Sequence, residues 1–239
     1  MRTARSATTP ARILTYLSSK SDPWIDLGLT LPILIGYHLG VIFLPTRNAA
    51  DFTTSRLSAL ANYSTIAYLG LTITIAAILV AVLTVAGRGK KLVWRRYAAV
   101  AAEGAAYAVA MCFIAQTVVG SLHLSSGGQH TFWSGLVRSL GAGFYEEVAF
   151  RVAIFGIGLA LLLKLVKKRR FLLLVSWAII TSAAFSGWHY YGVLADTFEL
   201  RSFVFRWICG IAFVAIYHYR GFAPAVWCHT LYDIWVLAL

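Results

Sequence analysis

The chain has 239 residues, a formal net charge of +12, 59% hydrophobic residues and only 13% charged residues. Soluble globular domains carry about 25% charged residues and fewer apolar ones, so this composition argues against a water-soluble enzyme. The basic residues stand in short segments between long apolar runs, as in cytoplasmic loops beside anionic lipid, which argues against a nucleic acid partner. We therefore predict an all-α polytopic protein of the lipid bilayer, a bundle of about seven transmembrane helices.

Long apolar runs follow one another from residue 24 to the end of the chain. The seven predicted spans are 24–44, 66–86, 97–119, 136–163, 171–188, 202–219 and 222–239. The third is rich in small residues such as Gly104, which predicts close approach of a neighbouring helix. The fourth is long enough that we expect its helix to be tilted or broken.

The distribution of Lys and Arg predicts the orientation of these spans. When residues 1–23 are placed in the cytoplasm, the inside segments hold fifteen basic residues and the outside segments hold three. No compact apolar stretch precedes residue 24, so we expect the first span to act as the insertion signal, without a cleaved signal peptide. The sequence thus predicts an integral protein of the plasma membrane with a cytoplasmic N-terminus.

The first group of polar residues inside a predicted span is Glu146, Glu147 and Arg151. Ionisable groups at membrane depth are costly, so each is a candidate for function. Glu147 and Arg151 stand four residues apart on one helix face and are expected to pair. Glu146 points about 100° away from Glu147 and stays free for another role. A structural ion pair is the alternative, although two carboxylates beside one arginine leave a charge uncompensated.

Two histidine motifs lie in later spans. Phe185 begins a Phe-Ser-Gly-Trp-His pattern that places His189 at the outer end of the fifth span. His229 and Asp233 stand four apart in the seventh span, where a carboxylate can fix the tautomer of an imidazole. The structural alternative for His189, taken alone, is a residue at the membrane interface. For His229 and Asp233 the structural alternative is a buried hydrogen-bonded pair. In the predicted orientation all three motifs lie in the outer half of the bilayer, so they can meet in one cavity.

In chain order the patterns EExxxR, FxxxH and HxxxD resemble the CPBP family, which groups type II CAAX prenyl endopeptidases with bacteriocin-processing and immunity proteins. The resemblance covers residues 97–239, which it marks as a catalytic core, whereas residues 24–96 carry no matching motif. It implies a glutamic-type intramembrane endopeptidase that acts on a protein or peptide substrate within the membrane and needs no cofactor. We expect the substrate to be an exported or membrane-anchored protein, processed for maturation or sorting, in preference to CAAX processing.

The resemblance also implies a role for each motif residue. Glu146 is the general base that activates water, and His189 helps to hold that water. The buried pair that supports the site is Glu147 and Arg151, and the positions that stabilise the oxyanion are His229 and Asp233. The prenyl endopeptidases have Asn where this chain has Asp233, and an ionised Asp cannot donate a hydrogen bond. Two roles therefore stay open for Asp233: a protonated donor, or a carboxylate that orients His229.

Three alternative functions remain at this point. Glu146, His189 and His229 could bind Zn²⁺ as in a metalloprotease, although no HExxH motif is present. The protein could bind a peptide without cleaving it, as an immunity protein does. A proton-coupled transporter could use the same charges, but no inverted repeat is evident in the sequence.

Two further polar residues receive structural interpretations. His38 in the first span is expected to form a helix–helix hydrogen bond in preference to lining the cavity. Glu103 in the third span is expected to pair with Arg95 or Arg96, or to reach interfacial water.

Overall fold

The fold is a bundle of helices, seen in a computed structural model that describes residues 22–44, 46, 48–60, 64–87, 92–119, 131–192 and 195–238. The described elements are α2 (Pro23–Phe43), α3 (Phe52–Leu60), α4 (Thr65–Ala86), α5 (Trp94–Val119), α6 (Phe132–Gly141), η1 (Ala142–Ile157), α7 (Gly158–Leu165), α8 (Arg170–Trp188), α9 (Leu200–Arg220) and α10 (Phe222–Leu237). The all-α prediction is confirmed. Most of the predicted segment 1–23 lies outside the described residues.

Six helical stretches of the described chain are long and apolar enough to cross a bilayer. They are α2, the first part of α4, most of α5, the continuous run α6–η1–α7, α8 and α9. The seventh predicted span forms α10, whose 16 residues extend about 24 Å and fall short of a full crossing. The protein is therefore an integral membrane protein, and every predicted apolar segment is helical.

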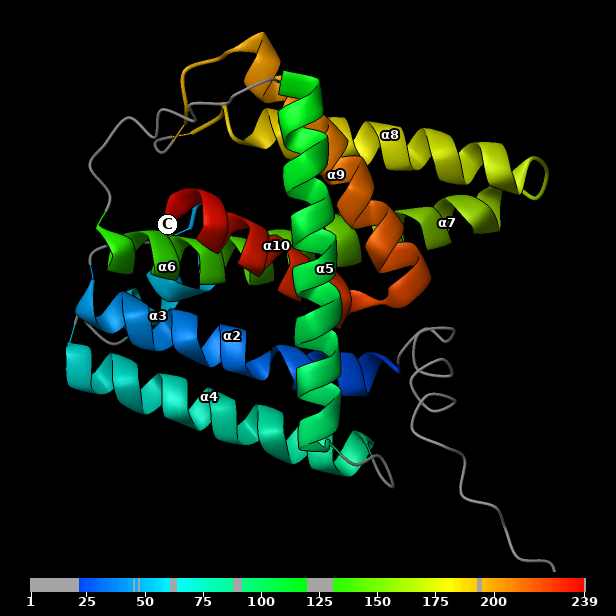
Figure 1. Cartoon of the computed structure of the whole chain (residues 1–239). Coiled ribbons are helices and arrows are strands. Elements are labelled where there is room, and N and C mark those ends of the chain that lie inside the picture. The colour runs from blue at the N-terminus through cyan, green and yellow to red at the C-terminus, as the bar shows by residue number, and fades with distance from the viewer. Residues whose placement is uncertain are drawn as a thin grey trace, which may run out of the picture.

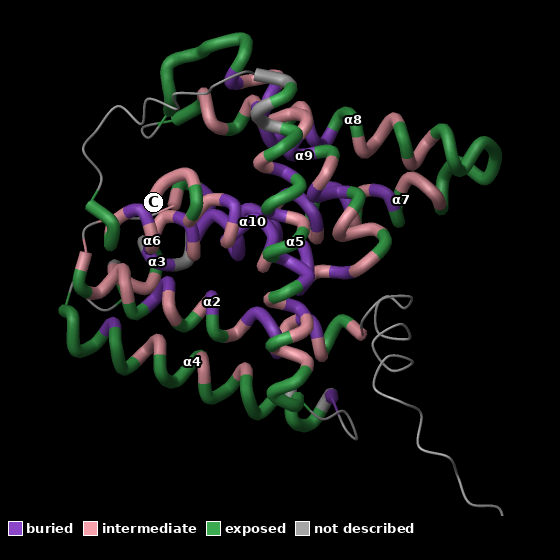
Figure 2. The backbone as a smooth tube through the Cα atoms, in the orientation of Figure 1, coloured by how far each residue is buried: buried purple, intermediate pink, exposed green. Residues whose placement is uncertain are grey.

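The helix α10 lies at the centre of the bundle. In Figure 1 it runs between α5 and the α6–η1–α7 rod, with α2 and α4 on one side and α8 and α9 on the other. It contacts α2, α5, α6, η1 and α9. Figure 2 shows buried residues concentrated along α10 and η1, whereas α4 is mostly exposed. His229 and Thr230 of α10 are buried, so these polar residues lie inside the protein and not against lipid.

Glycines allow the neighbours of α10 to approach closely. A Cβ atom at Gly104 of α5 would lie 2.7 Å from the Cβ of Trp227, and one at Gly143 of η1 would overlap the side chain of Thr230. Helices in a membrane associate largely by van der Waals packing, which improves when small residues let the backbones meet. The close approach predicted for the third span at Gly104 is confirmed, and Gly143 brings η1 to the same helix.

We expect Gly143→Ala to destabilise the protein. The added methyl group would lie 2.9 Å from the backbone nitrogen of Thr230, and a backbone atom cannot rotate away as a flexible side chain can. Overpacking of this kind costs about 1–3 kcal/mol, or a decrease in Tm of about 2–12 °C in detergent. The matched control is Gly70→Ala in α4, because a Cβ there meets nothing within 4 Å. Equal melting temperatures for the two variants would contradict the close contact between η1 and α10.

Buried polar contacts tie the ends of the helices together. Asp26 of α2 accepts hydrogen bonds from the backbone nitrogens of Phe222 (2.6 Å) and Ala223 (3.2 Å), at the N-terminus of α10. A carboxylate there satisfies free N–H groups and is favoured by the helix dipole. Gly221, with φ of 109°, forms the sharp turn between α9 and α10. Thus α2 fixes where α10 begins.

The structure tests both interpretations of single polar residues. His38 bonds through Nδ1 to the hydroxyl of Tyr68 (2.9 Å) and through Nε2 to that of Tyr145 (2.8 Å), so the predicted helix–helix hydrogen bond is confirmed. Glu103 accepts hydrogen bonds from Nε and Nη2 of Arg220, at 2.5 and 3.1 Å. The expected pairing of Glu103 with an arginine near the start of its own helix was wrong, because the end of α9 returns to α5.

Candidate active site

The Glu-Glu motif lies on a π-helix. The fourth predicted span is one continuous rod, in which residues 142–157 form η1 between α6 and α7. The expected break is therefore a widening of the helix over 16 residues. Such wide turns are rare and are usually found as short insertions at functional sites. Glu146, Glu147 and Arg151 are all buried, with 4%, 0% and 1% of their surface exposed.

Arg151 is held by one carboxylate and two aromatic rings. Its Nε lies 3.2 Å from Oε2 of Glu147, so the predicted pair is present. Its guanidinium carbon lies 4.2 Å from the ring centre of Phe185 and 4.9 Å from that of Phe213. Cation–π contacts of this kind offset part of the cost of burying the charge. The pair is therefore buried beside His229, which contacts Glu147.

His229 is oriented by Glu147. The Nδ1 atom lies 2.7 Å from Oε1 of Glu147, and the imidazole stacks on Phe213 with 4.4 Å between ring centres. Its Nε2 lies 3.6 Å from Oδ2 of Asp233, on the same face of α10 but beyond hydrogen-bond distance. The structural alternative, a hydrogen-bonded pair of Asp233 with the imidazole, does not fit this distance. The contact of η1 with α10 gives Nδ1 of His229 the carboxylate of Glu147, while Nε2 faces Asp233.

His189 lies directly after the end of α8, on the more open side of the group. Its Nδ1 donates to the carbonyl oxygen of Phe185 at 3.0 Å, because a carbonyl can only accept. The Nε2 atom therefore faces Glu146, at 3.8 Å from Oε2. The His189 side chain is 23% exposed, against 6% for that of Glu146. His189 is thus the more exposed of the two side chains.

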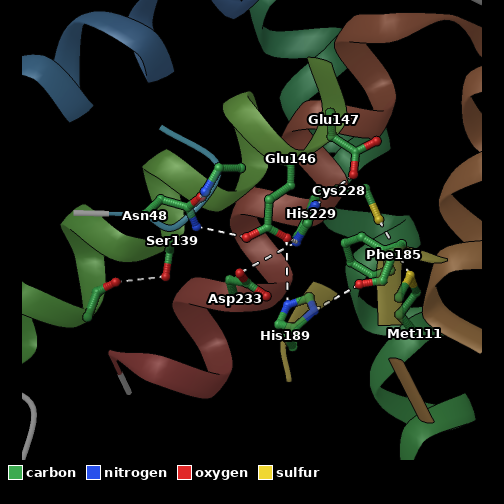
Figure 3. A network of polar contacts seen from close by, with 12 residues as sticks. Asn48, Met111, Ser139, Glu146, Glu147, Phe185, His189, Cys228, His229 and Asp233 are labelled. Carbon is green, nitrogen blue, oxygen red and sulfur yellow. Dashed lines mark hydrogen bonds and ion pairs between the residues drawn. The ribbon is translucent and has the colours of Figure 1, made fainter. Parts of the chain in front are cut away.

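Glu146 lies at the centre of the three motifs (Figure 3). Its Oε2 is 3.8 Å from Nε2 of His189 and 3.9 Å from Nε2 of His229, and no hydrogen-bond partner for Oε2 is found among the described residues. Its Oε1 accepts a 2.8 Å hydrogen bond from Nδ2 of Asn48. The structure brings together all six residues of the motifs: Glu146, Glu147, Arg151, His189, His229 and Asp233.

Asn48 is a member of the group that the sequence analysis missed. It lies between α2 and α3, in the part of the chain that carries no matching motif. A lone Asn after a span gives no signal of its own, and 98 residues separate it from Glu146 in the sequence.

Cys112, Cys209 and Cys228 are free thiols. Within the described ranges, no group of three or more His, Cys, Asp and Glu residues is arranged to hold a metal ion.

In a comparison with known proteins, the part of the chain that holds these motifs matches one protein family. The family model of type II CAAX prenyl endopeptidase Rce1-like proteins matches residues 128–235. This range contains all six motif residues and leaves out α2 to α5, and with them Asn48. No curated protein and no solved structure matches the chain. This match over residues 128–235, on a helical membrane fold with the three motifs gathered around Glu146, supports an assignment to the type II CAAX prenyl endopeptidase family.

Proposed function

We propose that this protein is a glutamic-type intramembrane endopeptidase, in which Glu146 activates a water molecule to hydrolyse a peptide bond. The observation that carries the proposal is the position of Oε2 of Glu146, 3.8 and 3.9 Å from the Nε2 atoms of two imidazoles. These distances exceed a direct hydrogen bond. They leave room for a water molecule between Oε2 and an imidazole nitrogen, at hydrogen-bond distance of about 2.8 Å from each.

Glu146 is the general base in this proposal. Amide hydrolysis needs a base that takes a proton from water, a nucleophile held in place and donors for the developing oxyanion. The water lies between Oε2 of Glu146 and Nε2 of His189, gives its proton to the carboxylate and attacks the carbonyl carbon. The tetrahedral intermediate then collapses, the C–N bond breaks, and Glu146 passes the proton to the leaving amine. The carbonyl of Phe185 holds the proton of His189 on Nδ1, which leaves the lone pair of Nε2 to accept from the water.

His229 is the candidate donor to the oxyanion. Three carboxylates surround its ring: Glu147 at 2.7 Å, Asp233 at 3.6 Å and Glu146 at 3.9 Å. In its protonated form His229 donates from Nδ1 to Glu147 and from Nε2 toward the developing charge. Asp233 then acts as a nearby negative charge that supports the imidazolium. Asp233 thus has an electrostatic role in this proposal, and no donor is required at the position where the prenyl endopeptidases have Asn.

The location of the site supports a substrate processed on the outer side. His189 follows the end of α8, whereas Arg170 begins that helix and Lys164 lies near the end of α7. Basic residues mark the cytoplasmic ends of spans, so the site lies in the half of the bilayer away from the cytoplasm. The proposal accordingly places the protein in the plasma membrane, with its N-terminus inside, processing a membrane-anchored or exported protein for maturation or sorting.

A panel of peptides tests this function. Purified protein in nanodiscs receives internally quenched peptides of three kinds: a farnesylated CAAX peptide, the same peptide without the lipid, and an apolar helix with a polar C-terminal tail. We expect cleavage of at least one, and Glu146→Gln is the inactive control. If no product arises from cleavage within an added peptide, or if the peptides bind without being cleaved, the endopeptidase proposal is contradicted. That result would favour a peptide-binding protein.

Metal dependence is tested on the same peptides. A base that acts on water without a metal predicts full activity after incubation with 1,10-phenanthroline and EDTA, and no stoichiometric zinc by elemental analysis. Zn²⁺ bound by His and carboxylate ligands would instead be removed by the chelators, and activity would return on adding Zn²⁺. Loss and recovery in that order would replace the glutamic mechanism with a metalloprotease.

A further inference from the structure

Asn48 lies outside the Rce1-like segment, yet its side chain contacts Glu146. Its Nδ2 donates to Oε1 of Glu146 at 2.8 Å, the shortest contact of that carboxylate with a described side chain. In Figure 3, Asn48 stands on one side of Glu146, with the two histidines toward its other oxygen. The donor therefore occupies the oxygen that does not face the imidazoles.

The orientation of the Asn48 amide is determined by its own segment. Its Oδ1 accepts a 2.7 Å hydrogen bond from the backbone nitrogen of Ala50. Because the amide oxygen alone can accept, this contact turns the NH₂ group toward Glu146. The backbone nitrogen of Asn48 donates to the hydroxyl of Tyr37 at 3.2 Å. The amide oxygen and the amide nitrogen of Asn48 thus each have a partner, and a flip of the amide would lose both hydrogen bonds.

The segment that carries Asn48 is anchored independently of Glu146. Tyr37 of α2 is fully buried and donates from its hydroxyl to Oδ2 of Asp51 at 2.6 Å. Oδ1 of Asp51 accepts from the backbone nitrogen of Thr54, in the first turn of α3. A fixed donor of this kind is already in place before any substrate arrives, which is what preorganisation of a catalytic group requires.

We propose that Asn48 is a positioning residue for Glu146, an inference that rests on the function proposed above. A glutamate carboxylate rotates easily about its last torsion, since that torsion is broad. The hydrogen bond from Asn48 stops this rotation by holding Oε1, and it keeps Oε2 directed at His189 and His229. Residues 24–96 therefore contribute to the site through α2 and the segment after it.

The isosteric variant Asn48→Asp tests this role by activity. It keeps an oxygen to accept from Ala50 and so keeps the local turn, but it replaces the donor to Glu146 with an acceptor. We expect kcat on the cleaved quenched peptide to fall about 10–100-fold, as for a misplaced catalytic group, while KM changes by less than about twofold. The neighbouring exposed position supplies the control Ala49→Ser, with unchanged kcat. A kcat of Asn48→Asp within twofold of wild type would overturn the positioning role.

A melting-temperature cycle tests the contact without any substrate. At pH 8, Asn48→Asp places two carboxylates together and should lower Tm by about 4 °C. In the Glu146→Gln background the glutamine amide can donate to the new carboxylate, so the hydrogen bond re-forms in reverse and the loss should stay below about 1 °C. Equal losses in both backgrounds would overturn the proposal. A larger loss of Tm in the wild-type background supports the proposal. Cleavage of peptide by the Glu146→Gln protein would instead overturn the proposed function, whatever the Tm values.

Discussion

Glu146→Gln should abolish peptide cleavage while the protein keeps its fold. The glutamine side chain retains an oxygen that can accept from Asn48, so the 2.8 Å hydrogen bond survives. Its amide nitrogen cannot take a proton from water, and loss of a general base costs about 10²–10⁴-fold in rate. We expect kcat to fall by about 10³-fold or more, with Tm within about 2 °C of wild type. The measurement is turnover of the quenched peptides in nanodiscs, together with a thermal melt of the same preparation.

The neighbouring residue offers a matched control. Glu147→Gln makes the same chemical change one position along η1, but Glu147 contacts Arg151 and His229 and not the proposed water. It leaves the buried guanidinium without its counter-charge, so Tm should fall by about 6 °C or more. The two variants thus separate a chemical role from a structural one. A Glu146→Gln protein that cleaves normally would remove Glu146 as the base.

Arg151→Met should strongly destabilise the protein. Arg151 is 1% exposed, and its charge is balanced by Glu147 and covered by the rings of Phe185 and Phe213. Methionine fills much of the same volume but leaves the Glu147 carboxylate buried with His229 as its remaining hydrogen-bond partner. Removing one member of a buried ion pair costs about 3–5 kcal/mol, equivalent to a decrease in Tm of about 6–20 °C. Tm in detergent, followed by tryptophan fluorescence, measures the effect.

Two comparisons show whether the cost comes from the unpaired charge. The double variant Glu147→Gln/Arg151→Met removes both charges, and its Tm should lie above the value expected if the two single losses added. Asp196→Asn breaks the pair of Asp196 with Arg206, which is more exposed, and should change Tm by less than about 2 °C. Two results would show that the buried pair is not a main source of stability. One is a Tm of the double variant equal to that expected from adding the two single decreases, and the other is a decrease in Tm for Arg151→Met no larger than that for Asp196→Asn.

Much of the helical scaffold was predictable because apolar runs dominate this sequence. A segment of about 20 apolar residues has few alternatives to a helix in a bilayer, where every backbone polar group needs an internal partner. The predicted spans therefore agree with α2, α4, α5, the α6–η1–α7 rod, α8, α9 and α10. The short helix α3 was missed, since its nine residues mix polar and apolar types without a clear apolar run.

Part of the candidate site could also be predicted from the sequence. Spacing of four residues in the sequence was enough to place Glu147 beside Arg151, and His229 on the face of Asp233, because helix geometry alone brings such pairs together. The sequence also showed which ionisable residues lie within apolar spans. An ionisable side chain at membrane depth costs free energy unless it is paired, so these residues were candidates for function.

Only the tertiary structure decided which partner each polar group has. The contact between η1 and α10 gave His229 the carboxylate of Glu147, and the turn after α2 gave Glu146 the amide of Asn48. Neither contact has a sequence signature, because the partners come from different helices and are joined by packing and not by periodicity. Hydrogen bonds act over about 3 Å, so side chains separated by 82 or 98 residues become partners only when the bundle has formed.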